Sequence, residues 1–139
     1  MASSLVDAAA AARRHARAGI SGFAVGAAIE TVDGVVITGC NVENATLGLT
    51  MCAERVALLK ALSEGHARFT RIAIVASDRV AVPPCGACRQ LLWEFAGDLE
   101  VVLAAGGGRT VSHQLKDLLP TPFDARLLDG SLRRDEDRS

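Results

Sequence analysis

The residues in this chain that are best equipped for chemistry are three cysteines and one glutamate, which occur in two short motifs. The first motif is Cys52-Ala53-Glu54-Arg55 and the second is Pro84-Cys85-Gly86-Ala87-Cys88. Cysteine thiolates bind zinc, and a catalytic zinc site has three protein ligands and one open position, whereas a structural site has four. Cys52, Cys85 and Cys88 therefore predict one zinc ion per chain, with a position left open for water.

Glu54 is the candidate for proton transfer beside that ion. A metal ligand two residues before a glutamate, followed later by Pro-Cys-x-x-Cys, is the signature of zinc enzymes that deaminate bases. We expect Glu54 to be the general acid and base, which takes a proton from the attacking water and passes it to the ring nitrogen and the leaving ammonia. An acid that only complements the helix dipole is the simpler alternative, but it leaves the place of Glu54 between a ligand and an arginine unexplained.

The cysteines also allow a structural zinc site that is closed by a fourth ligand. Cys40 or a histidine, such as His66 or His113, would have to supply it. The spacing and the adjacent carboxylate favour the catalytic site. We expect Cys40 to be a small buried residue at the end of a strand, and the histidines to be ordinary solvated residues.

Arg55 follows the glutamate and is the candidate to compensate charge. Three thiolates exceed the charge of a divalent zinc ion by one, which raises the pKa of a bound water relative to a histidine-ligated site. A nearby cation is therefore needed. We expect Arg55 to hydrogen-bond one or two of the ligand sulfurs.

Asn41 and Glu43 form a third polar feature, after a predicted strand. In an extended segment their side chains point the same way, and an amide beside a carboxylate can hold a sugar diol. A polar loop that merely caps the next helix explains the same two residues equally well. Both interpretations stay open at this point.

A hairpin is predicted to carry this polar segment. Residues 23–31 and 35–40 favour strand, and the Asp33-Gly34 pair between them is a strong signal for a tight turn. The two strands are therefore expected to pair antiparallel.

The next element is a helix over residues 51–64, with Thr50 as its N-cap and Gly65 as its stop. Its apolar side chains leave little polar surface, so burial on most sides is expected. One face of a sheet cannot cover such a helix, and a neighbouring subunit is the simplest second cover. We therefore predict an oligomer.

Two uninterrupted apolar runs, residues 72–76 and 99–104, have the pattern of strands that are covered on both faces. The helix predicted between them, over residues 85–95, implies a parallel strand pair with a right-handed crossover. Cys85 and Cys88 lie three residues apart at its start and share a face. The zinc site is then expected at two helix N-termini, where unpaired N–H groups favour negative charge.

Two more helices are predicted toward the ends of the chain. The first is capped by Ser4 and fades at Gly19, and the second is capped by Ser112 and ended by Pro120. Residues 1–130 are expected to form a single domain, and residues 131–139 a charged, frayed tail.

Composition narrows the class of partner. The net charge of −1 lacks the excess of Lys and Arg that a nucleic-acid surface needs, so the expected substrate is small. Cysteines in metal-ligand spacing fit a reducing compartment, and we interpret the chain as cytoplasmic. No apolar run reaches about 18 residues, so no membrane-spanning segment is predicted.

The motifs together resemble the small, zinc-dependent, homotetrameric cytidine deaminases of pyrimidine nucleoside salvage. The resemblance covers most of the chain and rests on five segments: Phe23-Ala-Val-Gly-Ala-Ala28, Cys40-Asn-Val-Glu-Asn-Ala45, Cys52-Ala-Glu-Arg55, Pro84-Cys-Gly-Ala-Cys-Arg-Gln90 and Leu118-Leu-Pro120. It implies an α/β fold, a three-layer α/β/α sandwich around a five-stranded mixed sheet. It also implies that a hydrolase of this kind converts cytidine and 2′-deoxycytidine to uridine and 2′-deoxyuridine with release of ammonia.

The resemblance assigns roles to further residues. Asn41 and Glu43 are expected to bind the ribose 3′-hydroxyl. Ala53 and Glu54 are expected to contact the pyrimidine, Ala53 through its backbone. The remaining two contacts are aromatic, and the resemblance places them on Phe23, which packs against the base, and on Phe123, which comes from a neighbouring subunit.

This chain departs from the family in having no tyrosine. Ile20 and Leu47 occupy places where the family usually carries one, which removes hydroxyls that could contact substrate or a neighbouring subunit. Deamination of a different aminated heterocycle, similar to blasticidin S deaminase, is therefore the first alternative. A deaminase acting on polynucleotides and a non-enzymatic, zinc-stabilised interaction module are the others.

Overall fold

The computed structural model of the chain describes residues 2–130 and contains one five-stranded sheet in the order β2-β1-β3-β4-β5. The elements follow the chain as α1 (Ala2–Arg13), β1 (Gly26–Thr31), β2 (Val36–Cys40), η1 (Leu47–Leu49), α2 (Ala53–Ser63), β3 (Phe69–Val75), α3 (Gly86–Ala96), β4 (Glu100–Ala104), η2 (Gly106–Gly108), β5 (Thr110–Gln114), α4 (Leu115–Leu118) and α5 (Ala125–Asp129). The predicted tail, residues 131–139, lies outside the described residues.

The hairpin and the parallel pair are both confirmed. β1 pairs antiparallel with β2, and Gly34 in the turn has a positive φ of 84°, which glycine adopts without strain. β3 pairs parallel with β4, with α3 between them in sequence. β1 also pairs antiparallel with β3, and β5 with β4, so the sheet is mixed.

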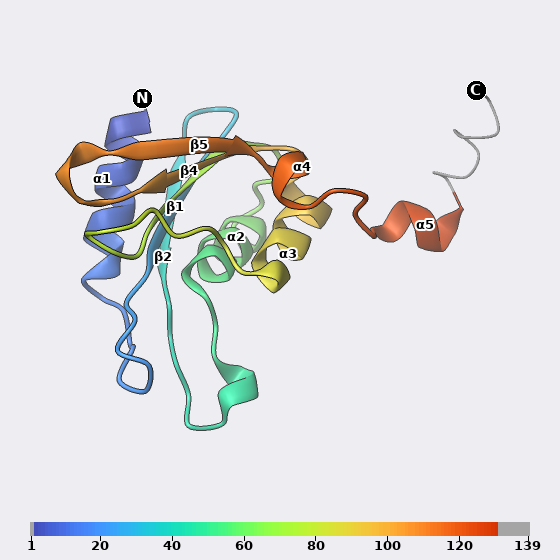
Figure 1. Cartoon of the computed structure of the whole chain (residues 1–139). Helices are drawn as coiled ribbons and strands as arrows, with labels where there is room; N and C mark the ends of the chain where they lie inside the picture. The colour runs from blue at the N-terminus through green and yellow to red at the C-terminus, as the bar shows by residue number, and fades with distance from the viewer. Residues whose placement is uncertain (1, 131–139) are drawn as a thin grey trace.

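The two faces of the sheet are covered by different helices, as strand alternation requires. On one face Ala28, Ala73 and Val102 pack with Leu5 and Ala9 of α1. On the other face the isoleucines of β1, β2 and β3 pack with α2 and α3, together with Val101 and Leu103 of β4, in the larger part of the core. Figure 1 shows α1 on one side of the sheet and α2 with α3 on the other. The expected three-layer α/β/α sandwich is confirmed.

Gly39 allows α2 to approach the sheet closely. A Cβ at Gly39 would lie 2.6 Å from the Ala53 carbonyl oxygen and 2.6 Å from the Ala57 nitrogen, both backbone atoms of α2. Only glycine fits at this contact. The first turn of α2 is thereby held directly against β2, which leads into the Asn41–Glu43 segment.

The packing of α2 differs from the sequence prediction in degree. The sheet and α3 bury Ala53, Ala57, Leu58 and Ala61 within a single chain, whereas Leu59 keeps 39% of its surface exposed. One chain therefore covers more of α2 than its composition suggested. The oligomer stays a prediction.

Three helix starts differ from the prediction. α1 begins at Ala2, so Ser4 lies inside the helix, and Cys52 rather than Thr50 is the N-cap of α2. The helix that we expected between Ser112 and Pro120 is present, but its predicted start and cap at Ser112 are wrong, because residues 110–114 form β5 and pair with β4. Pairing with a neighbouring strand outweighs the local capping preference. α4 begins only after that strand, at Leu115.

A short helix, α5, was not predicted. Asp124 is its N-cap, and Figure 1 shows α5 beside the main body of the chain, beyond α4. Within residues 2–130, no helix combines the length and the apolar character that are needed to cross a membrane.

Candidate active site

The three candidate zinc ligands meet at the starts of α2 and α3. Cys52 and Cys85 are the N-caps of these helices, both with extended backbone, and neither side chain makes a capping hydrogen bond. Cys88 follows in the first turn of α3 and is buried. The sulfurs are therefore available as ligands, beside helix ends whose dipoles favour negative charge.

The spacing of the sulfurs fits a tetrahedral zinc ion. All three lie within 4.8 Å of one another, and the Cys85 and Cys88 sulfurs are 3.5 Å apart. Zinc–sulfur bonds of about 2.3 Å in tetrahedral geometry place two ligand sulfurs about 3.8 Å apart. In the part of the chain that the structure describes, this cluster contains neither Cys40 nor a histidine. The donor set thus fits a zinc ion with a fourth position open to water, and not the closed structural site.

The charged groups around the three cysteine sulfurs also favour the binding of a cation. Burial and the nearby Glu54 carboxylate raise the pKa of the Cys88 thiol, because both disfavour its anion, and a bound metal ion would supply a compensating positive charge and displace the proton. Arg55 lies against the cluster, with Nη2 3.2 Å from the Cys52 sulfur and 3.4 Å from the Thr50 carbonyl oxygen. The hydrogen bond to Cys52 raises the pKa of Arg55 further above its usual value. Arg55 therefore contacts a ligand sulfur as the sequence predicts.

Glu54 lies in the first turn of α2 and is only 5% exposed. Burial raises the pKa of its carboxyl above the usual value, while the Cys88 thiol and the Arg55 charge act in the opposite direction. A carboxyl group whose pKa is raised in this way is suited to both accept and return a proton near neutral pH.

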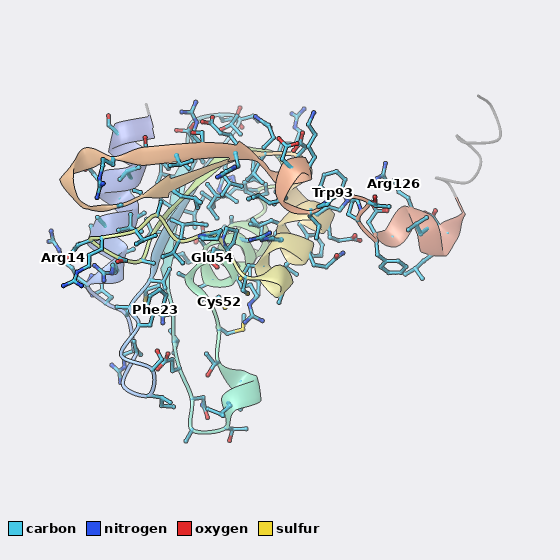
Figure 2. All side chains as sticks on the ribbon, viewed as in Figure 1. Arg14, Phe23, Cys52, Glu54, Trp93 and Arg126 are labelled. Carbon is cyan, nitrogen blue, oxygen red and sulfur yellow. The ribbon has the colours of Figure 1, made fainter. Side chains whose placement is uncertain are left out.

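A cavity of about 330 Å³ opens beside the cluster. It joins residues from five separate segments, and the predicted site residues that line it are Phe23, Asn41, Glu43, Cys52, Ala53, Glu54 and Cys85. Figure 2 shows Phe23, Cys52 and Glu54 in the same region of the molecule. The volume lies within the range of pockets that enclose small molecules.

Asn41 is 7% exposed and holds residues 23–25, the segment that leads from Phe23 into β1. Its Oδ1 accepts a hydrogen bond from the Val25 N–H at 2.9 Å, and its Nδ2 donates to the Phe23 carbonyl oxygen at 2.8 Å. These bonds take the place of strand pairing, which explains why β1 begins at Gly26 and not at Phe23 as predicted. Asn41 thus combines a place on the cavity wall with a structural function.

Glu43 is held by the loop that precedes Phe23. Its carboxylate accepts hydrogen bonds from the backbone N–H groups of Ile20 and Ser21, each at 2.9 Å, and from the Ser21 hydroxyl. Sequence reasoning missed Ser21, although Ser21 lines the cavity. The only local signal was a serine in a turn before Phe23, and such serines are common in loops.

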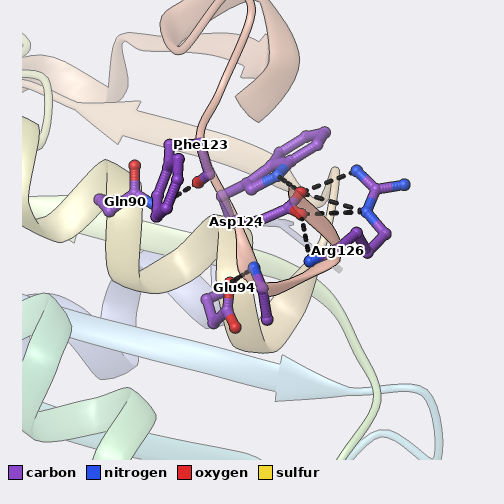
Figure 3. A network of polar contacts seen from close by, with 7 residues as sticks. Gln90, Glu94, Phe123, Asp124 and Arg126 are labelled. Carbon is purple, nitrogen blue, oxygen red and sulfur yellow. Dashed lines mark hydrogen bonds and ion pairs between the residues drawn. The ribbon is translucent and has the colours of Figure 1, made fainter. Parts of the chain in front are cut away.

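Phe123 is not brought into the cavity of its own chain. It is 56% exposed and lies along the outer side of α3, where its carbonyl oxygen accepts a hydrogen bond from the Gln90 side chain. The next residue, Asp124, accepts hydrogen bonds from Trp93 Nε1 at 2.9 Å and from the Arg126 side chain. Figure 3 shows this network between α3 and the segment that leads into α5.

Comparison with known proteins assigns the chain to a protein family. Residues 1–105 match the family model described as "Cytidine and deoxycytidylate deaminase zinc-binding region". The chain belongs to the cytidine deaminase family. A cytidine deaminase of Halalkalibacterium halodurans is 47% identical over 122 residues, which cover 87% of this chain and 92% of that protein.

Solved structures agree with this assignment. The crystal structure of cytidine deaminase from Burkholderia pseudomallei has a TM-score of 0.83 and 48% identity, and the match covers 86% of this chain and 97% of that one. The blasticidin-S deaminase of Bacillus cereus is 35% identical over 107 residues, which cover 71% of this chain and 76% of that protein. This member of the cytidine deaminase family therefore carries the zinc-binding region, with its three-cysteine cluster.

Proposed function

We propose that the chain catalyses the hydrolytic deamination of cytidine and 2′-deoxycytidine to uridine and 2′-deoxyuridine, with release of ammonia. The observation that carries this proposal is the cavity itself. A buried glutamate beside the three-cysteine cluster forms one part of its wall, and an amide and a carboxylate form another. One small nucleoside can span the two groups, with its base at the cluster and its sugar at Asn41 and Glu43.

At the base end, Cys52, Cys85 and Cys88 would hold a zinc ion, which when bound would lower the pKa of a water at its open position and so make a nucleophile available near neutral pH. Glu54 accepts the proton of that water at its carboxylate and delivers it to the ring nitrogen next to the amino-bearing carbon. It then takes the remaining proton from the hydroxyl that has been added to this carbon and passes it to the amino group, which leaves as ammonia while the carbonyl forms. Its burial and its raised pKa support this double role.

The other contacts orient the base. The Ala53 backbone, in the same helical turn as Glu54, contacts the pyrimidine, and Phe23 packs against it. Arg55 compensates the extra negative charge of the thiolate cluster through Cys52. These roles are proposals that rest on the cavity lining and on the family resemblance.

At the sugar end, we assign Asn41 and Glu43 to the ribose 3′-hydroxyl. The loop interpretation and the sugar interpretation are compatible, because both residues brace residues 20–25 and also line the cavity. This pair favours a nucleoside over other aminated heterocycles. Deamination of a substrate similar to blasticidin S stays the second candidate, supported by the 35% identity to the Bacillus cereus protein.

The assembly that fits this function is a homotetramer. Phe123 lies outside its own cavity and is exposed, which leaves it free to reach the cavity of a neighbouring chain. Thiolate ligands also require a reducing compartment, so we place the protein in the cytoplasm, in the salvage of pyrimidine nucleosides. We further propose that residues 1–130 act as one domain.

The experiment that tests the function follows the loss of cytosine ultraviolet absorbance and the release of ammonia, with zinc-loaded protein and cytidine. We expect turnover by the wild type. The Glu54→Gln variant should lose at least about a thousandfold in kcat, because it removes the proton carrier. Zinc content measured by mass spectrometry should stay at one ion per chain, since Glu54 is not a ligand.

Absence of turnover by the zinc-replete wild type would overturn the proposed substrate. The same assay with blasticidin S then tests the second candidate. A Glu54→Gln variant with near-normal kcat would overturn the proposed proton transfer alone.

A further inference from the structure

Ile20 and Ser21 make three hydrogen bonds to Glu43, the carboxylate that we place at the sugar. Glu43 Oε1 accepts two hydrogen bonds, from the N–H groups of Ile20 and Ser21, and Oε2 accepts one from the Ser21 hydroxyl. A carboxylate has about four lone-pair sites for hydrogen bonds. Three are therefore taken by one loop, and the site that is left is on Oε2.

The Ser21 hydroxyl has a second contact, toward the base end of the cavity. Its oxygen accepts a hydrogen bond from the Phe23 N–H at 3.0 Å. One hydroxyl group thus joins the side chain of Glu43 to the backbone of Phe23. Ser21, Phe23 and Glu43 all line the same cavity.

These hydrogen-bond donors also favour the ionised form of the Glu43 carboxyl. The hydrogen bond from the Ser21 hydroxyl, followed by that from the Ser21 N–H, lowers the pKa of the Glu43 carboxyl below its usual value. An ionised carboxylate accepts hydrogen bonds and donates none. A sugar hydroxyl can therefore donate to its remaining site, whereas a sugar that lacks this hydroxyl leaves the site to water.

We infer that Ser21 is a positioning residue that orients Glu43 and thereby sets the selectivity of the enzyme for a sugar hydroxyl. The inference rests on the proposed function, because it assumes that the sugar lies at Glu43. Without the hydroxyl, the Ile20 and Ser21 N–H groups still hold Oε1, while Oε2 loses its anchor. The carboxylate then rotates more freely and pairs less well with the substrate hydroxyl.

The test compares cytidine with 2′,3′-dideoxycytidine, which carries the same base without the sugar hydroxyls at that end. The preference is the ratio of kcat/KM for the two nucleosides. For Ser21→Ala we expect this preference to fall about tenfold, the effect of one hydrogen bond to a charged group. The change should lie in KM for cytidine, with little change in kcat.

Two variants control this measurement. Ser21→Thr keeps the hydroxyl and should restore most of the preference. Ser112→Ala is the matched control. Ser112 is an exposed serine of β5 that donates a hydrogen bond to Glu100 Oε1 at 2.9 Å, and it does not line the cavity. Its loss should leave kcat/KM for both nucleosides unchanged. A role of Ser21 in loop stability alone would weaken both substrates equally and leave the preference intact.

A double variant separates action through Glu43 from any independent effect. If Ser21 acts through Glu43, adding Ser21→Ala to Glu43→Gln should change the preference less than twofold. The inference is overturned if the two substitutions change the preference independently, or if Ser21→Ala leaves the preference unchanged. In either case the wild type still deaminates cytidine, and the proposed function is not affected. A wild type that does not deaminate cytidine overturns the proposed function, and the inference with it.

Discussion

At the scale of single residues, the site places the three cysteines, the proposed proton carrier Glu54 and the Arg55 guanidinium within a few positions of two helix starts. Cys52, Glu54 and Arg55 are nearly consecutive in the sequence. Their side chains nevertheless make different contacts, because they leave the helix in different directions. Cys52 caps α2, Glu54 faces the cavity, and Arg55 folds back to the Cys52 sulfur. The short sequence motif thus encodes a three-dimensional arrangement.

Arg55 offers a prediction at this scale. A cation beside the thiolates favours loss of their protons, which zinc must displace. We expect Arg55→Gln to lower zinc affinity about tenfold, with a smaller kcat at full zinc loading. Competition with a chromogenic chelator measures the affinity.

Arg55→Lys is the matched control, because it keeps the charge and loses the planar guanidinium. It should retain more zinc affinity than Arg55→Gln. Equal zinc binding and equal turnover in wild type and Arg55→Gln would contradict a compensating role for Arg55.

At the scale of elements, close contacts position the helices that carry the ligands. Gly39 brings the first turn of α2 against β2, and α3 follows β3 in the parallel pair. The C-terminal segment is attached to α3 by polar contacts instead: Asp124 accepts from Trp93, the Phe123 carbonyl accepts from Gln90, and the Ala125 N–H donates to Glu94. Part of this attachment depends on the charge of Asp124, which Arg126 in α5 also contacts.

The pH dependence of this attachment follows from the direction in which the pKa of Asp124 is shifted. The hydrogen bonds from Arg126 and Trp93 hold the pKa of Asp124 well below its usual range. A carboxyl group whose pKa is lowered in the folded state contributes stability above the unfolded pKa of about 4, and this contribution is lost as the pH falls below it. The segment should therefore stay attached at neutral pH and loosen progressively below about pH 4.

Trp93 is the only tryptophan in the chain, so its fluorescence reports directly on this contact. We expect a change in Trp93 emission below about pH 4 in the wild type. Asp124→Asn should lack that step, because its side chain does not ionise. The same acid transition in both proteins would show that another group controls the segment.

At the scale of the whole molecule, Phe123 connects the fold to the proposed assembly. It sits on the outer side of α3, while the cavity opens beside the starts of α2 and α3. If Phe123 completes the site of a neighbouring chain, its loss lowers activity without touching the cavity of its own chain. Assembly and catalysis are then linked.

We predict a mass of about four chains by light scattering at micromolar concentration, and roughly a tenfold loss of kcat/KM in Phe123→Ala. Co-expression of Phe123→Ala with Glu54→Gln provides the decisive control. Mixed tetramers then contain sites with an intact Glu54 and an intact Phe123 from different chains, and part of the activity should return. A monomeric mass, or no recovery in mixed tetramers, would contradict this arrangement.

Local patterns in the sequence were sufficient for the zinc ligands, the adjacent glutamate, the β1–β2 hairpin and the parallel pair. Metal ligands at fixed spacing, a turn dipeptide and apolar runs depend on residues that are close in the chain. The predicted start of a helix at Ser112 was wrong for the opposite reason. Its residues pair with β4, and a capping signal contains no information about a neighbouring strand.

The sequence by itself determined the three-cysteine cluster and the position of the proposed proton carrier beside it, because Cys52, Glu54 and the Cys85–Cys88 pair are specified by type and spacing. Only the tertiary structure decided how Glu43 is held, since its partners lie 22 and 23 residues earlier in the chain. It also decided that Phe123 lies outside its own cavity. Contacts across such separations form when the sheet and its helices pack, and residue type alone does not specify them.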